Sequence, residues 1–131
     1  MQKSEIKNSS DLFLYKAIID LNSAKYLLDG FNHENIEIDI DKIYFELQQS
    51  AEKALKSLLS KHTIKFPKSH DIEHLINICI EEAIPLIQDV ERLIELSDFA
   101  VEGRYSIISD DLNDSELFIH LIEKLIRNIA S

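Results

Sequence analysis

The sequence predicts an all-α protein, an antiparallel bundle of about five helices that forms one domain over residues 1–131. Apolar residues make up 45% of the chain, and they recur at the three- and four-residue steps of a helix face. Only two glycines and two prolines occur, fewer than turn-rich β folds need. Mostly short polar stretches separate the periodic segments, and such connections join neighbouring helices that run antiparallel.

The first two predicted helices have clear boundaries. The first begins after Ser10, a residue type that favours the N-cap, and it ends at Gly30, with residues 1–9 as a flexible tail. The second runs from about Ile40 to Ser60 and has the most regular apolar stripe. A helical projection places five residues together on the opposite face, which we expect to be exposed: Gln49, Glu52, Lys53, Lys56 and Ser60.

Three further helices follow. Ser69 is the expected N-cap of the third, and Asp71 in its first turn suits the positive end of the helix dipole. Pro85, as a first-turn proline, opens the fourth helix, which ends at Gly103. Asn113 is the expected N-cap of the last helix.

Four apolar residues of the third and fourth helices lie outside the main stripes: Ile78, Ile80, Leu86 and Leu96. Apolar residues on a second face indicate a second buried surface. We therefore expect a homodimer.

The cysteine content indicates the redox state of the compartment in which the protein occurs. Cys79 lies in an apolar run and is the single cysteine, so the chain has no disulfide framework and no cysteine metal cluster, and a reducing compartment is expected. The first ten residues lack the apolar core of a signal peptide, and no apolar run approaches the roughly 18 residues of a membrane span. These features predict a cytoplasmic protein without a membrane segment.

The charge is unevenly distributed. The chain carries a net charge of −10, yet the stretch from Lys53 to His70 contains no acidic residue. This stretch, which we call the basic segment, contains five lysines: Lys53, Lys56, Lys61, Lys65 and Lys68. Such a cluster is commonly a solvated surface, but it can also bind phosphate groups.

The second helix offers two interpretations of these lysines. Lys53 and Lys56, three residues apart, could hold a phosphate while Gln49, one turn earlier, contacts a base or ribose. Alternatively, Glu52 and Lys56 form an ordinary surface ion pair, since their four-residue spacing has the favourable order.

Three stretches of the sequence resemble motifs of a known protein family. The stretches "QQSAEKALKSLL", "FPKSHDIEHL" and "VEGRY" are similar to successive landmarks of the HEPN domain family, and the resemblance extends over nearly the whole chain. It implies an all-α bundle that commonly dimerises. It also implies roles as an RNase or as the toxin of a toxin–antitoxin pair, beside a small nucleotidyltransferase.

One departure limits the activity that the resemblance implies. Catalytic members carry an Arg followed four to six residues later by a His, which can accept the proton of a ribose 2′-hydroxyl. Arg104 matches the arginine, but positions 109–111 read Ser, Asp and Asp. The chain instead resembles the branch with "HD" at His70 and Asp71 and "RY" at Arg104 and Tyr105, for which RNA or nucleotide binding is suggested.

The sequence therefore predicts a protein that binds RNA or a nucleotide and lacks the usual RNase motif. The expected ligand-binding residues are Arg104, Tyr105, Lys53, Lys56, Gln49, His70 and Asp71. Arg104 is the candidate catalytic residue if the chain is a ribonuclease. Two alternatives remain open: a dimeric partner subunit of a nucleotidyltransferase that binds no nucleic acid, and a metal-independent RNase with a non-standard base.

We expect neither a cofactor nor a bound metal. His70 and His74 have a spacing that can place two imidazoles on one metal, but two ligands do not complete a site. A metal-dependent phosphohydrolase site would combine His33, His70 and Asp71 with Asp98 or Asp110. For this, His33 would have to leave its polar loop and join the helices that carry the other ligands.

Overall fold

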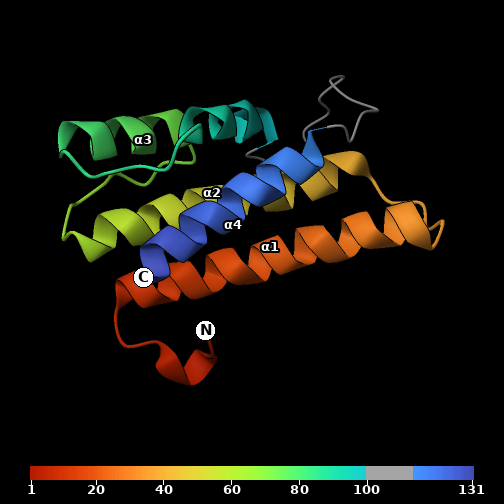
Figure 1. Ribbon diagram of the computed structural model, residues 1–131, viewed down its shortest axis with the longest axis horizontal. Coiled ribbons are helices and arrows are strands. Elements are labelled where there is room, and N and C mark those ends of the chain that lie inside the picture. The colour runs from red at the N-terminus through yellow and green to blue at the C-terminus, as the bar shows by residue number, and fades with distance from the viewer. Residues whose placement is uncertain (100–113) are drawn as a thin grey trace.

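The computed structural model describes residues 1–99 and 114–131, and this part of the chain is helical and contains no strand. Its elements are the 3₁₀ turn η1 (Lys3–Glu5), α1 (Ser9–His33), α2 (Ile40–Lys61), α3 (Ile72–Glu81), the 3₁₀ helix η2 (Val90–Phe99) and α4 (Ser115–Ala130). Helices α1, α2 and α4 extend along the long axis, while α3 and η2 lie on one side of them (Figure 1). The predicted all-α helical fold is confirmed.

Helix α2 is the central element, because it contacts α1, α3, η2 and α4. Small residues allow α1 to approach it closely. Ser50 Oγ donates to the Ala17 carbonyl oxygen at 2.7 Å, and Ser10 and Ser57 each donate to the other's carbonyl oxygen at 2.9 and 2.8 Å. The two contacts lie seven residues apart on each helix, so they repeat after two turns of the antiparallel pair.

The ends of α1 differ from the prediction. Asn8, rather than Ser10, is the N-cap, and its side chain accepts a hydrogen bond from the Asp11 N–H. At the other end, Gly30 does not stop the helix, which continues to His33. Asn35 has a φ of 54°, and asparagine is one of the few residue types that adopt this conformation readily.

Asp71, rather than Ser69, is the N-cap of α3. Its carboxylate accepts hydrogen bonds from the N–H groups of Glu73 at 3.0 Å and His74 at 3.4 Å. Ser69 acts one step earlier, because its hydroxyl accepts from the Asp71 N–H at 3.0 Å. The polar run "SHD" therefore sets the start of α3, but the cap lies two residues later than predicted.

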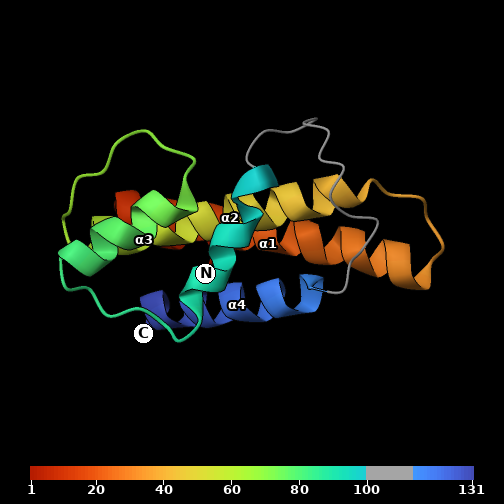
Figure 2. The ribbon, with the colours of Figure 1, turned by 90° about the horizontal axis from the view of Figure 1, so that it is seen from above.

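The prediction that Pro85 opens a helix is wrong, because the next helix begins at Val90 and is of the 3₁₀ type. Figure 2 shows that η2 runs across α2 and α4 instead of along them. Its buried residues are Val90, Leu93, Leu96 and Phe99. This three-residue interval matches the three residues per turn of a 3₁₀ helix. The predicted end at Gly103 and the predicted cap at Asn113 lie outside the described residues.

The expected second surface on α3 and η2 largely disappears. Leu96 is fully buried in the core, while Ile78 and Leu86 are partly buried against it. Ile80 remains exposed, at 62%. The described residues contain no helix that is long and apolar enough to cross a lipid bilayer.

Helices α2 and α3 end in the same way. The Ile64 N–H donates to the Leu59 carbonyl and the Ile84 N–H to the Cys79 carbonyl, both at 2.9 Å, which is the six-residue bond of a Schellman motif. Thr63 and Ala83 lie at positive φ inside these turns, at 57° and 56°. A side chain in this conformation is strained, and glycine would avoid that strain.

We expect Ala83→Gly to raise the free energy of unfolding by about 1 kcal/mol, because Ala83 is exposed and its Cβ is the source of the strain. Urea denaturation measures the change. The control is Lys16→Gly at an exposed position inside α1, which should lower the free energy of unfolding by about 0.7 kcal/mol. A loss of stability in Ala83→Gly would contradict the account of this turn.

Cys79 is fully buried in α3, and burial raises the pKa of its thiol to about 11. The thiolate is the form that reacts with alkylating agents. We therefore expect Cys79 to resist iodoacetamide at pH 8 in the folded protein and to react readily in urea, as followed by mass spectrometry. Equal rates in the two states would contradict the packing of α3.

Candidate functional site

A buried carboxylate lies at the centre of the candidate site. Glu52 on α2 is only 3% exposed, so the prediction that it faces solvent is wrong. On a helix of 3.6 residues per turn it lies about 20° from the direction of Leu59, at the edge of the apolar stripe. The segment between α2 and α3 packs over this edge and removes Glu52 from water.

Three side chains donate hydrogen bonds to this carboxylate. The Nδ1 of His70 lies 2.9 Å from Glu52 Oε1, and the Nζ of Lys56 lies 3.1 Å from Oε2. The side-chain amide of Gln48 is 3.3 Å from Oε1. We call these four residues the Glu52 cluster. A buried carboxylate is tolerated when cations and hydrogen bonds compensate for its lost hydration, and this cluster provides both.

Gln48 connects the cluster to the backbone. Its side-chain amide also donates to the carbonyl oxygen of His70 at 3.1 Å, and its own oxygen accepts from Gln49 at 2.8 Å. His70 is therefore held to α2 through both its ring and its backbone. It immediately precedes Asp71, the N-cap of α3, so the cluster also fixes where α3 begins.

An aromatic contact also holds the segment between α2 and α3 against the bundle. The ammonium of Lys56 lies 6.0 Å from the centre of the Phe66 ring, a cation–π distance. Phe66 in turn packs edge to face against Phe13 of α1, with ring centres 5.9 Å apart. The segment from α2 to α3 is thereby attached to both α1 and α2.

The imidazole of His70 differs from its partners in exposure, since 69% of the side chain is accessible against 4% for Glu52. An ionised carboxylate only accepts hydrogen bonds, so Nδ1 must carry the proton that points to Glu52. The other ring nitrogen, Nε2, has no hydrogen-bond partner among the described residues. The cluster therefore presents one ring nitrogen of a fixed imidazole to solvent.

The lysines of the second helix are not on an open face, which corrects the prediction. Lys53 lies 2.5 Å from Asp20 of α1, and the Lys53 side chain is only 24% exposed. Lys56 is 12% exposed and paired with Glu52. The predicted Glu52–Lys56 pair thus exists but is largely buried. The Lys53 ion pair joins α2 to α1, whereas the Lys56 ion pair lies within α2.

The other lysines of the basic segment differ among themselves. Lys61 donates to the carbonyl oxygen of Ile129 at 2.6 Å and so binds the end of α4. Lys65 and Lys68 are exposed and form no ion pair within the described residues. They lie on the connection that ends at His70.

The predicted site residues therefore separate into four groups. Gln49, Lys56 and His70 come together around Glu52, whereas Lys53 lies towards α1. Asp71 lies next to His70, but its carboxylate is engaged as a helix cap. Arg104 and Tyr105 lie outside the described residues, so their predicted roles stay predictions.

Sequence reasoning missed Gln48 and misjudged Glu52. A signal was present, because Gln48 projects in a direction between Leu55 and Leu59, within the apolar stripe of α2. A polar residue in such a stripe is buried and must find a partner there. Glu52 follows one turn later and is that partner.

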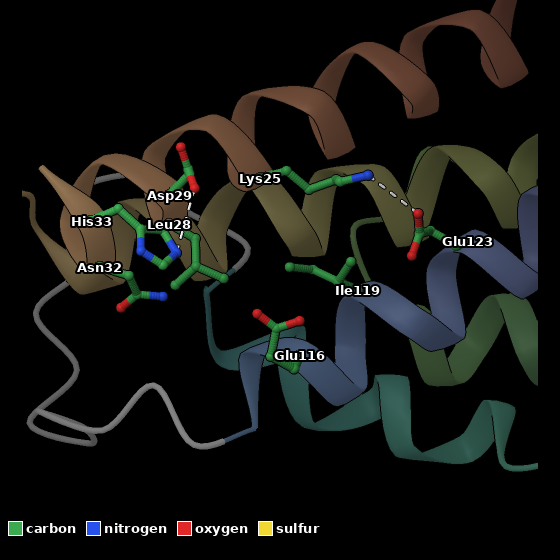
Figure 3. Close-up of a pocket in the computed structure, with 8 residues that line it drawn as sticks. All are labelled: Lys25, Leu28, Asp29, Asn32, His33, Glu116, Ile119 and Glu123. Atoms are coloured by element: carbon green, nitrogen blue, oxygen red, sulfur yellow. Dashed lines mark hydrogen bonds and ion pairs between the residues drawn. The ribbon is translucent and has the colours of Figure 1, made fainter.

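A second polar hollow lies between the end of α1 and the start of α4 (Figure 3). It measures about 230 Å³. Lys25 and Glu123 form an ion pair of 3.2 Å at one end, and His33 pairs with Asp29 at 3.6 Å. Glu116 faces this hollow from α4 in Figure 3.

This arrangement bears on the metal alternatives. His33 lies at the end of α1, beside the start of α2, whereas α3 lies over the second half of α2 (Figure 1). Within residues 1–99 and 114–131, no group of three or more His, Cys, Asp or Glu side chains is placed to hold a metal ion. Asp110 lies outside these ranges.

Glu52→Gln tests the energetics of the cluster. The substitution keeps the size of the side chain and removes its charge, which leaves the Lys56 ammonium partly buried without an anion. We expect the free energy of unfolding in urea to fall by about 3 kcal/mol. The control is Glu95→Gln, which breaks an exposed pair with Arg92 and should cause no measurable change. Equal effects of the two substitutions would show that the Glu52 cluster contributes no more than a surface ion pair.

Comparison with curated proteins and with solved structures finds no match. A family model described as HEPN domain matches residues 10–130, which is 121 of the 131 residues. The match includes α1 from its second residue, all of α2, α3 and α4, and every member of the Glu52 cluster, so the chain belongs to the HEPN domain family.

Proposed function

We propose that this HEPN domain binds the phosphate groups of RNA or of a nucleotide at the surface formed by His70, Lys65 and Lys68. The observation that carries the proposal is an exposed imidazole that is fixed on a buried carboxylate. Two exposed lysines precede it by two and five residues on the same connection, and neither forms an ion pair in the described part of the chain. We call this the His70 surface.

Charge supports this location over the rest of the basic segment. Phosphate binding depends on cations that are free to displace counterions. Lys53 and Lys56 are already paired with Asp20 and Glu52, so they have little charge to offer. The His70 surface lies within residues 65–70, which contain no acidic residue.

The His70 surface is also held in place before a ligand binds, which supports it as the binding site. Binding is weakened when a loop must become ordered in the complex. Here Gln48 and Glu52 hold both the backbone and the ring of His70 before any ligand arrives. The Phe66 contact holds the middle of the same connection. By the family resemblance, Arg104 and Tyr105 complete the proposed site.

A second candidate function is protein binding, and a specific observation favours it. Leu12, Ile19 and Tyr26 of α1 are 41%, 43% and 80% exposed. They lie seven residues apart and so share one face of the helix. This face suits a protein partner, either a second copy of the chain or a nucleotidyltransferase.

The test measures binding of fluorescently labelled single-stranded RNA by anisotropy at 50 and 200 mM salt. We expect the double variant Lys65→Glu, Lys68→Glu to weaken binding at least tenfold at 50 mM salt. It should also reduce the slope of log affinity against log salt by about 1.4, which corresponds to two phosphate contacts on a single strand. Competition by ATP distinguishes a nucleotide site from one that needs a longer strand.

The matched control is Lys3→Glu, Lys16→Glu, which changes the net charge equally at two exposed positions outside the basic segment. This control should retain most of the affinity. Equal losses in the two double variants, or no binding by the unmodified protein at 50 mM salt, would contradict the His70 surface. If the protein binds neither RNA nor any nucleotide, the result would favour the protein-binding face of α1.

A further inference from the structure

We propose that the hollow between the end of α1 and the start of α4 binds a small diamine, an aliphatic chain with an ammonium group at each end. Five of the residues that line the hollow belong to α1 and three to α4 (Figure 3). None of them lies in the basic segment, so this site is separate from the His70 surface and does not depend on RNA binding. A ligand bound here contacts both α1 and α4.

The floor of the hollow is apolar. Leu28 of α1 and Ile119 of α4 are 5% and 6% exposed and belong to the hydrophobic core. The other residues that line the hollow are charged or polar, and none of them is buried. Contact with methylene groups removes the remaining apolar surface of the floor from water. The floor therefore favours a ligand with a hydrocarbon chain over a hydrated metal ion.

The rim of the hollow carries an excess of negative charge. Its carboxylates are those of Asp29, Glu116 and Glu123, and its one ammonium group belongs to Lys25. Lys25 and Glu123 form an ion pair of 3.2 Å, so their charges compensate each other. Asp29 lies 3.6 Å from the ring of His33, and imidazoles are neutral in alkaline solution. Two carboxylates remain, and a ligand with two positive charges balances them.

Glu116 is the carboxylate most open to a ligand. Its side chain extends from the first turn of α4 into the hollow (Figure 3). It forms no ion pair and no hydrogen bond within residues 1–99 and 114–131. The helix dipole accounts for an acidic residue at this position of α4, but it does not account for Asp29 on the facing helix. A cation between the two helices would compensate both carboxylates.

Size and arrangement determine the class of ligand. The hollow measures about 230 Å³, which is below the range of about 300–1,000 Å³ for pockets that take drug-sized ligands. Asp29, His33 and Glu116 are not placed to hold one metal ion together. A ligand that contacts both helices therefore needs its charges at two ends, with hydrocarbon between them over the floor. The probe with these features is 1,4-diaminobutane.

The experiment titrates 1,4-diaminobutane into the full chain and follows the methyl groups of Leu28 and Ile119 by carbon-13 NMR. It is performed at pH 8 and 50 mM salt, where the imidazole of His33 does not compete for Asp29. We expect saturable shifts of both methyl groups with a Kd of about 1 mM or below, the range open to a ligand with six non-hydrogen atoms. The methyl groups of Ile80, exposed on α3, should not shift.

Two related molecules separate the roles of charge and chain. n-Butylamine has the same four-carbon chain with one ammonium group, and it should bind at least threefold more weakly, since one partly exposed ion pair is lost. 1,4-Butanediol has the chain without charge and should cause no saturable shift. Equal binding of n-butylamine and the diamine would show that the second carboxylate is not used, and it would overturn the proposal.

Glu116→Gln tests the site from the side of the protein. It should raise the Kd for 1,4-diaminobutane at least threefold. The matched control is Glu81→Gln, which removes one exposed carboxylate at the end of α3 and should leave the Kd unchanged. Equal effects of the two substitutions would reveal general attraction to an acidic protein and would overturn the site. Absence of saturation at Leu28 and Ile119 would also overturn it.

Thermal unfolding provides a second measurement. A ligand that binds only the folded protein raises the Tm, and at ten times its Kd the expected rise is about 5 °C for a chain of this length. n-Butylamine at the same ionic strength is the control and should give a smaller rise. A rise that Glu116→Gln leaves intact would place the diamine elsewhere and contradict the proposal. None of these outcomes bears on RNA binding at the His70 surface.

Discussion

The burial of one carboxylate constrains the arrangement of this bundle. Removing Glu52 from water costs several kcal/mol unless opposite charge and hydrogen bonds compensate. Lys56 and Gln48 compensate from the same helix, one turn away on either side. The third donor, His70, belongs to another segment, so the chain between α2 and α3 must fold back over α2 for the carboxylate to be satisfied. The position of α3 follows from this requirement.

This constraint also changes how the charge of the basic segment is distributed. Two of its lysines compensate acidic groups inside the bundle, and Lys61 binds the end of α4. Lys65 and Lys68 remain exposed on the connection that leads to His70, whose ring is held by Glu52. The surface proposed to bind phosphate therefore lies on the part of the basic segment that is not used to hold the bundle together.

The helices were largely predictable because their signals are local. Apolar periodicity located α1, α2, α3 and α4, and α2 begins at Ile40 as expected. The errors arose where a tertiary contact outweighed a local preference. Ser10 was expected to cap α1, but its hydroxyl bonds to Ser57 of α2, so Asn8 takes the cap. The residues after α3 pack at three-residue intervals across α2 and α4, which an α-helical projection cannot detect.

The sequence by itself determined the helical class, the approximate helix positions and the family resemblance, because each depends on residue types at fixed spacings along the chain. It also singled out His70 as a candidate site residue. Only the tertiary structure decided that Glu52 is buried, that Lys53 and Lys56 are paired within the bundle, and that Nε2 of His70 has no partner among residues 1–99 and 114–131. The physical reason is that the exposure of a polar residue at the edge of a stripe depends on which distant segment packs over it.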